Sequence, residues 1–241
     1  NTYVAGRTYS SDFPVTAGSY DTSYNGAGDA FVVKLNATGG GVVFSTLLGG
    51  TQDDVIRKLH IDLNGSLVIA GATTSSDFPV SPGAVDSATR GGIDIFVAML
   101  NDTGTQLNFS AVVGGSQDDA PRGVSLDPAG NILVGGFSGS SNFPTTPGAY
   151  DTSYNGDVRD VIAFRLNHNA TAITYSTFIG GTSREWAHDV VMDDDGYIYL
   201  GGVAESSNFP VTSGAFDVTH NGYWDAFVCK LDPAGLGSQD L

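Results

Sequence analysis

The sequence predicts an all-β protein, and its composition gives the first reason. Of the 26 acidic side chains, 24 are aspartates, and the 241 residues include 33 glycines. Aspartate and glycine are turn residues, whereas a helix-rich protein favours glutamate, lysine and arginine. Hydrophobic residues make up 41% of the chain, which is enough for a packed core. We therefore expect short strands joined by many turns.

An internal repeat gives the second reason. The dipeptide Phe-Pro recurs at spacings of 65, 65 and 66 residues, an Asp-led strand start follows the same period, and three Gly-Gly pairs also recur at this period. Several motifs at one period indicate tandem copies of one structural unit, and the chain holds about 3.7 copies. The motifs begin at Phe13, Phe78, Phe143 and Phe209, at Asp29, Asp94, Asp160 and Asp225, and at Gly49, Gly114 and Gly180.

Each copy predicts four strands. In the second copy, apolar runs at residues 55–61, 67–70, 95–100 and 107–113 are bounded by Gly, Asn and Asp. Such runs are typical of strands separated by turns, and no stretch keeps a helical period. Gly71 is expected to end the second strand, and a long polar loop then leads to the third strand.

Four antiparallel strands repeated along a chain are typical of a β-propeller in which each copy is one blade. Both faces of a blade pack against neighbours, which explains why residues 96–100 are apolar on both sides. A β-solenoid would need a much shorter repeat, and tandem sandwich domains would need about 100 residues per unit. The repeat exceeds the roughly 40–50 residues of an ordinary blade because of a long loop, for example residues 11–28.

Together these motifs resemble the SBBP repeat, a family named for the seven-bladed β-propeller and found on surface and secreted proteins of archaea and bacteria. The resemblance covers nearly the whole chain and departs in the fourth copy, where Arg184-Glu185 replaces an acidic pair. It implies propeller architecture and a surface address, and it implies no catalytic residues. In the second copy the matching residues are Gly49, Gly50, Asp53, Asp54, Asp62, Gly65, Gly71, residues 75–79 and residues 94–97.

The repeat divides the chain into residues 1–54, 55–119, 120–185 and 186–241. The first unit lacks an inner strand and the fourth lacks an outer strand, so about 14 strands are expected, too few to close a ring by themselves. We therefore predict part of a larger propeller or repeat array. Unpaired strand edges favour self-association or pairing with neighbouring chains.

Charge and sequence motifs exclude several functions. The net charge of −16 and a pI of about 4.2 lack the basic footprint of nucleic-acid binding, and no apolar run approaches the roughly 20 residues of a membrane helix. The four histidines share no metal-ligand spacing, and no nucleophile elbow is present, so we predict no enzyme. The single cysteine, Cys229, aligns with Val33, Ala98 and Phe164, which predicts a small buried side chain.

Five Asn-x-Ser/Thr sequons predict N-glycosylation if the protein is extracellular. Asparagine and threonine also suit hairpin tips without any glycan, so both interpretations stay open. The sequon asparagines are Asn36, Asn64, Asn101, Asn108 and Asn169.

Two sets of charged residues are candidate ligand sites. Acidic pairs follow two Gly-Gly turns, and clustered aspartates can bind a hard cation such as Ca²⁺, although aspartates also cap turns. A basic residue recurs three positions after the acid that begins each inner strand, which is Asp54, Asp119 or Glu185. Such a column would line a propeller channel, where it would bind a small anion or pair with the acids. The acids are Asp53, Asp54, Asp118 and Asp119, and the bases are Arg57, Arg122 and His188.

These patterns favour a non-enzymatic structural module of an extracellular or cell-surface protein, such as a surface layer, a filament or an adhesin. The alternative is a propeller that binds a carbohydrate or a small anion at the mouth of its channel. The fold alone does not choose between them.

Overall fold

The computed structural model describes residues 1–86 and 88–234, which form fourteen β-strands. The prediction of an all-β protein is therefore confirmed. No helix in this part of the chain is long and apolar enough to cross a membrane. The strands are β1 (Thr2–Thr8), β2 (Asp29–Leu35), β3 (Val42–Leu48), β4 (Asp54–Ile61), β5 (Leu67–Thr73), β6 (Asp94–Leu100), β7 (Leu107–Val113), β8 (Asp119–Leu126), β9 (Ile132–Ser138), β10 (Asp160–Leu166), β11 (Ile173–Ile179), β12 (Glu185–Met192), β13 (Ile198–Ala204) and β14 (Asp225–Leu231).

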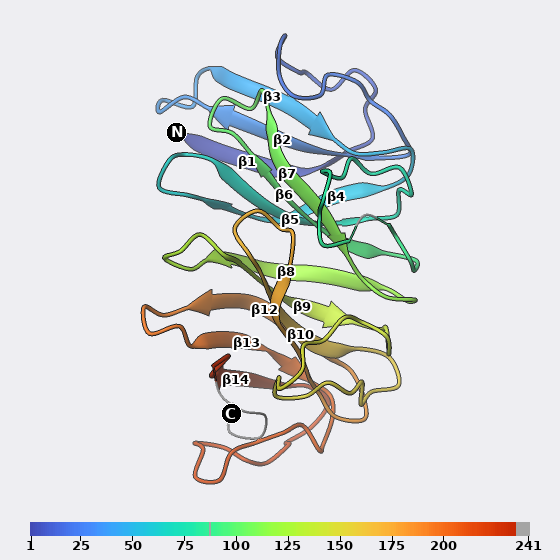
Figure 1. Cartoon of the computed structure of the whole chain (residues 1–241), viewed down its shortest axis with the longest axis vertical. Coiled ribbons are helices and arrows are strands. Elements are labelled where there is room, and N and C mark those ends of the chain that lie inside the picture. The colour runs from blue at the N-terminus through green and yellow to red at the C-terminus, as the bar shows by residue number, and fades with distance from the viewer. Residues whose placement is uncertain (87, 235–241) are drawn as a thin grey trace.

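The strands form four antiparallel sheets that follow one another along the longest axis of the molecule (Figure 1). Their orders are β1-β2-β3, β4-β5-β6-β7, β8-β9-β10-β11 and β12-β13-β14. The first and last sheets lie at opposite ends of the row (Figure 1), so the described residues do not close into a ring. In a complete sheet we call the first strand the inner strand and the fourth strand the outer strand. The third strand lies next to the outer strand.

One predicted strand boundary is wrong for a clear physical reason. Gly71 lies inside β5 and pairs with Phe96 of β6, where the sequence suggested a strand end. A Cβ at Gly71 would lie 2.2 Å from Cζ of Phe96. The glycine therefore makes room for the aromatic ring of the next strand and does not end its own.

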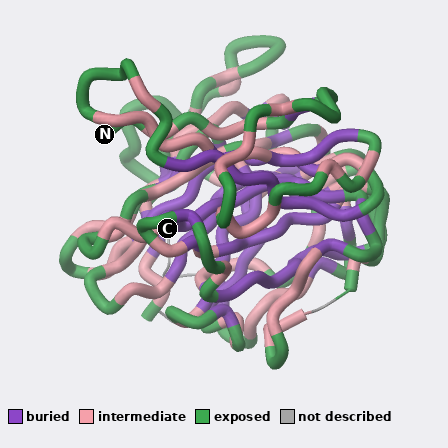
Figure 2. The backbone as a smooth tube through the Cα atoms, turned by 90° about the horizontal axis from the view of Figure 1, so that it is seen from above, coloured by how far each residue is buried: buried purple, intermediate pink, exposed green. Residues whose placement is uncertain are grey.

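Apolar layers between successive sheets hold the row together. In β6, Phe96 belongs to the layer facing the first sheet, where its ring lies 4.5 Å from that of Phe78. Its neighbour Val97 belongs to the layer facing the third sheet. Both side chains are fully buried, which explains the two-sided apolar pattern of the strand. Figure 2, in which the row of sheets runs toward the viewer, shows buried backbone mostly near the centre of the view and exposed backbone at the outer loops and hairpin tips.

Candidate functional site

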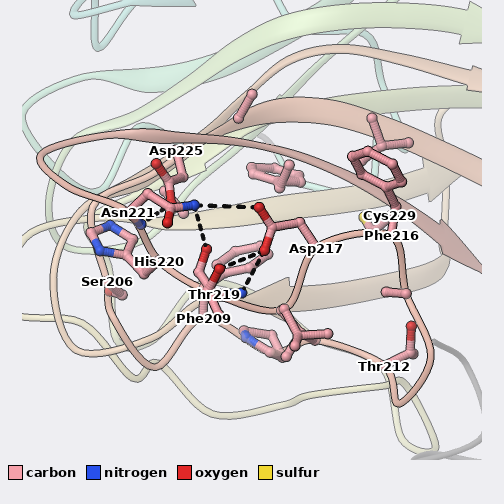
Figure 3. A pocket seen from close by; sticks show the side chains of 18 of the residues that line it. Ser206, Phe209, Thr212, Phe216, Asp217, Thr219, His220, Asn221, Asp225 and Cys229 are labelled. Carbon is pink, nitrogen blue, oxygen red and sulfur yellow. Dashed lines mark hydrogen bonds between the residues drawn. The ribbon is translucent and has the colours of Figure 1, made fainter.

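A groove of about 710 Å³ runs along the last sheet, between β14 and the loop that precedes it (Figure 3). Phe227, Val228 and Cys229 of β14 line one part, and Thr212 and Asp217 of the loop line another. In the sheet order β12-β13-β14, β14 is the terminal strand. Among the described residues, no further strand lies against its free edge.

In the other sheets the equivalent space is filled by the outer strand. In the first sheet, β3 pairs with β2 on one side and with the preceding loop on the other. The Thr16 N–H donates to the Ser45 carbonyl (2.9 Å), and the Leu47 N–H donates to the Asp21 carbonyl (3.0 Å). The Ser45 N–H donates to Thr16 Oγ1 (2.6 Å). The same backbone bonds in the second and third sheets are Ser81 to Ser110, Val112 to Asp86, Thr146 to Ser176 and Phe178 to Asp151.

The loop beside β14 has the conformation of its counterparts even though no outer strand holds it. The Ala215 N–H donates to the Thr212 carbonyl (3.2 Å), as Ser19 does to Thr16 (3.1 Å). The Thr219 N–H donates to Asp217 Oδ1 (2.9 Å), one of the contacts drawn in Figure 3. The groove is therefore preformed, with a width set by turns inside the loop.

The face of the last sheet that borders the groove is apolar and exposed. Val228 is 83% exposed, whereas Val32, Val97 and Ala163 at the same position of the other sheets are fully buried. Phe216 is completely exposed, while its counterpart Tyr20 packs against the apolar layer between the first and second sheets. Single exposed apolar residues are ordinary, but a group of them at repeat positions that are elsewhere buried marks an interaction surface.

The groove was not predicted as a site from the sequence. One signal was present: the Phe-Pro and Asp-led motifs occur four times, and the Gly-Gly turn that ends each outer strand occurs three times. Among the described residues, the fourth sheet accordingly has no outer strand.

Cys229 confirms the prediction of a small buried side chain. Burial raises the pKa of its thiol to about 12, so the side chain is a poor nucleophile at neutral pH. It faces the third sheet, within the same apolar layer as Leu200.

The three residues of the basic column occupy equivalent positions in three sheets. Arg57, Arg122 and His188 are each the extra residue of a β-bulge in an inner strand, β4, β8 or β12. The bulge places two residues opposite one and re-aims the side chain. Burial, followed by the charges of Arg57 and Arg159, lowers the pKa of Arg122. The guanidinium of Arg159 lies 4.2 Å from the Phe137 ring centre, and that of Arg122 lies 5.8 Å from it.

None of the three ion pairs found in the described chain includes a member of the basic column. Those pairs are Arg7–Asp53, Lys58–Asp189 and Arg90–Asp86. The arginines of the column are thus not neutralised by adjacent carboxylates.

The acidic pairs are divided between two environments. Asp53 and Asp118 lie near the surface, and Asp53 pairs with Arg7 at 3.4 Å. Asp54 and Asp119 are fully buried. The Asp54 carboxylate accepts from the Gly50 N–H (2.7 Å) and the Ser75 hydroxyl (2.8 Å). These buried aspartates therefore cap the Gly-Gly turns.

Each buried acid approaches a second buried acid from the preceding sheet. A Cβ built on Gly114 would lie 1.9 Å from Asp94 Oδ1 and 3.1 Å from Asp119 Oδ2, so both carboxylates converge on this glycine. Burial raises the pKa of both aspartates, and the charge of Asp94 raises that of Asp119 further, to about 6. The three pairs are Asp29 with Asp54, Asp94 with Asp119, and Asp160 with Glu185.

The acids do not form a larger ligand set. Within residues 1–86 and 88–234, no group of three or more His, Cys, Asp or Glu side chains could hold a metal ion. The predicted neighbours Asp53 and Asp54 serve different contacts, and Asp118 and Asp119 do likewise.

The sequons lie at turns and at one bulge. Asn64, Asn108 and Asn169 are exposed, whereas Asn36 and Asn101 are half-buried. The Asn101 amide is used locally, since it donates to Thr105 Oγ1 (3.0 Å). The exposed three therefore offer the more accessible amides.

Comparison with known proteins assigns no family. No family model matches the chain, and no curated protein matches it either. The resemblance to the SBBP repeat stays a prediction from the sequence motifs.

Proposed function

We propose that this protein is a non-enzymatic structural module of an extracellular or cell-surface assembly, such as a filament, a surface layer or an adhesin. Its sheets are blades of a β-propeller of the SBBP type, and it joins other chains through the open side of the last blade. Exposed sequons carry N-linked glycans, and the acidic surface keeps the assembly soluble.

The groove beside β14 is the main support for this proposal. It combines an unpaired strand edge with exposed apolar side chains, Phe216 and Val228 among them. An exposed strand edge is a template for another chain, and strand addition is a common way for proteins to assemble. A module that assembles in this way needs no catalytic group.

The oligomeric state tests the proposal. The purified chain is expected to form larger species with rising concentration, observed by light scattering coupled to gel filtration and by electron microscopy. Val228→Lys places a charge on the open face and is expected to shift the protein to monomers. Leu63→Lys is the matched control, because Leu63 is fully exposed at a hairpin tip away from the groove. A wild-type protein that stays monomeric at every concentration contradicts the proposal.

A second candidate function rests on the basic column. In a protein of net charge −16, Arg57 and Arg122 lie close enough to repel each other, and neither forms an ion pair with any described carboxylate. An anionic ligand, such as a sulfated or carboxylated sugar, would relieve that repulsion. Isothermal titration with a sulfated oligosaccharide is expected to show binding that Arg122→Ala abolishes and Arg90→Ala keeps. Retained binding by Arg122→Ala rejects this candidate.

A further inference from the structure

We propose that the groove beside β14 receives one antiparallel β-strand from another chain, with the sequence pattern aromatic-Ser-Thr/Ala-apolar-apolar and a fixed register in which its serine lies opposite Cys229. This inference rests on the proposed assembly function and names the partner of that same surface. The intact sheets supply the pattern, the register and the hydrogen bonds.

The register follows from three equivalent strand pairs. The outer-strand serine lies opposite the fifth residue of the third strand in every complete case, as Ser45 does with Val33. Cys229 holds that fifth place in β14. The other two pairs are Ala98 with Ser110 and Phe164 with Ser176.

The loop offers polar groups that such a strand would satisfy. In the third sheet, the Ser176 hydroxyl donates to the Pro144 carbonyl (2.6 Å), and the Ser176 N–H donates to Thr146 Oγ1 (2.9 Å). Pro210 and Thr212 hold the same places beside β14. A serine in the incoming strand therefore meets one acceptor for its hydroxyl and one for its N–H.

Lys230 offers a contact for the aromatic residue of the pattern. In the first sheet, Lys34 lies opposite Phe44 of the outer strand, with its Nζ 5.8 Å from the ring centre. Lys230 holds the place of Lys34 in β14. An aromatic side chain opposite Lys230 would gain the same cation–π contact.

The 241 residues contain no unused copy of this pattern. It occurs at residues 44–48, 109–113 and 175–179, and each copy is already an outer strand of its own sheet. The occupant is therefore a further copy of this outer-strand pattern, and under the proposed assembly function a second chain supplies it.

Cys229 is the chain's only cysteine, which makes it a built-in probe of the register. The Ser45 N–H donates to Thr16 Oγ1 and the Ser45 carbonyl accepts from the Thr16 N–H, so both backbone groups point away from β2. The pairing of Ser45 with Val33 is therefore of the narrow, non-hydrogen-bonded kind, with Cα atoms about 4.5 Å apart. That separation permits a disulfide. A cysteine in place of the incoming serine would thus lie within bonding reach of Cys229.

The experiment uses the 241-residue protein and a synthetic peptide with the sequence of residues 173–181. The peptide carries Cys at the place of Ser176, activated as a mixed disulfide with an aromatic thiol. In alkaline buffer, which raises the thiolate fraction of Cys229, this thiolate attacks the peptide sulfur, a new disulfide forms and the aromatic thiolate leaves. Peptides with Cys at the place of Thr177 or Phe178 are the matched controls. Cross-linking is expected to be at least about tenfold faster for the serine position, because only there do the sulfurs meet.

Two further measurements complete the test. The uncross-linked peptide is expected to slow hydrogen exchange at β14 and at residues 210–217, and a proline at the place of Phe178, which removes the N–H aimed at the Asp217 carbonyl, is expected to remove this protection. Equal cross-linking at all three positions, or no protection of β14, overturns the inference. Peptide binding by a protein that never assembles would refute the proposed function alone, and assembly without peptide binding would refute this inference alone.

Discussion

Val97 and Val228 occupy the same position in the third strands of their sheets, yet Val97 is fully buried and Val228 is 83% exposed. Their local sequences are alike, Asp-Ile-Phe-Val and Asp-Ala-Phe-Val. The difference lies in what faces them, since β6 has the third sheet beside it and β14 has no described neighbour on that side. The two valines therefore separate the structure that each sheet forms by itself from the burial that it gains by packing against the next sheet.

Local structure is complete in both regions. The loop before β14 forms the same turns as the loops between stacked sheets, and β14 pairs with β13 in the same register as β6 with β5. Stacking therefore adds burial to a unit whose backbone is already arranged. Three pairs of equivalent substitutions measure that contribution.

The largest difference is expected from a charge placed at the two valines. Val97→Asp buries a carboxylate in an apolar layer and should reduce the free energy of unfolding by about 4 kcal/mol or more. Val228→Asp should change it by less than about 0.5 kcal/mol, as for other surface positions. Urea unfolding of both variants followed by fluorescence provides the measurement.

If Val97→Asp fails to fold, Val97→Ala takes its place, with an expected loss of about 1–2 kcal/mol from the removed methyl groups and the cavity. The comparison is made at protein concentrations at which the wild type is monomeric. Equal losses at positions 97 and 228 would then show that the chain itself covers the last sheet, contrary to the open groove.

A smaller difference is expected from two equivalent glycines. A Cβ on Gly26 would lie 2.6 Å from the Gly50 carbonyl oxygen and 2.7 Å from that of Gln52, whereas a Cβ on Gly222 would meet nothing within 4 Å. Gly26→Ala should therefore lower the free energy of unfolding by about 1–3 kcal/mol through forced backbone shifts. Gly222→Ala should leave it nearly unchanged, as measured by thermal unfolding. A comparable loss at Gly222 would mean that a backbone segment also approaches that glycine.

Much of this fold could be predicted from sequence because its signals are local. Apolar runs between turn residues place the strands of the second copy to within three residues at each end, and the 65-residue period sets their number. The fit of Gly71 against Phe96 was not predictable, because it depends on the register between two strands separated by a long loop.

The sites were harder to predict for a related reason. The meeting of Asp94 and Asp119 joins two sheets, and the bulges that aim Arg57 and Arg122 depend on strand pairing that composition does not encode. The groove exists because no described strand lies beside β14, so its residues look in sequence like those of any buried sheet. Only the count of motif copies distinguishes them.

The smallest difference is expected in how the protonation of two equivalent aspartates, Asp160 and Asp225, affects stability. Burial, together with the charge of Glu185, raises the pKa of Asp160 to about 7 from an ordinary value near 3.8. Between those values the native state binds more protons than the unfolded state, so this contribution to stability is fully present below about pH 3.8 and is lost progressively as pH rises to about 7. The protein should be more stable at pH 5 than at pH 8 by roughly 1–2 kcal/mol.

Asp160→Asn removes the buried charge while the side-chain oxygen can still accept from the Asn155 N–H (2.7 Å). At pH 8 it is expected to raise the free energy of unfolding, and it should flatten the dependence on pH between 5 and 8. Asp225→Asn is the control, because Asp225 accepts the same bond from the Asn221 N–H (2.6 Å) and no acid from a further sheet faces it among the described residues. Urea unfolding at both pH values distinguishes the two variants. Stability that rises from pH 5 to pH 8 in the wild type would show that the paired carboxylates are neutralised by something other than protons, such as a bound cation.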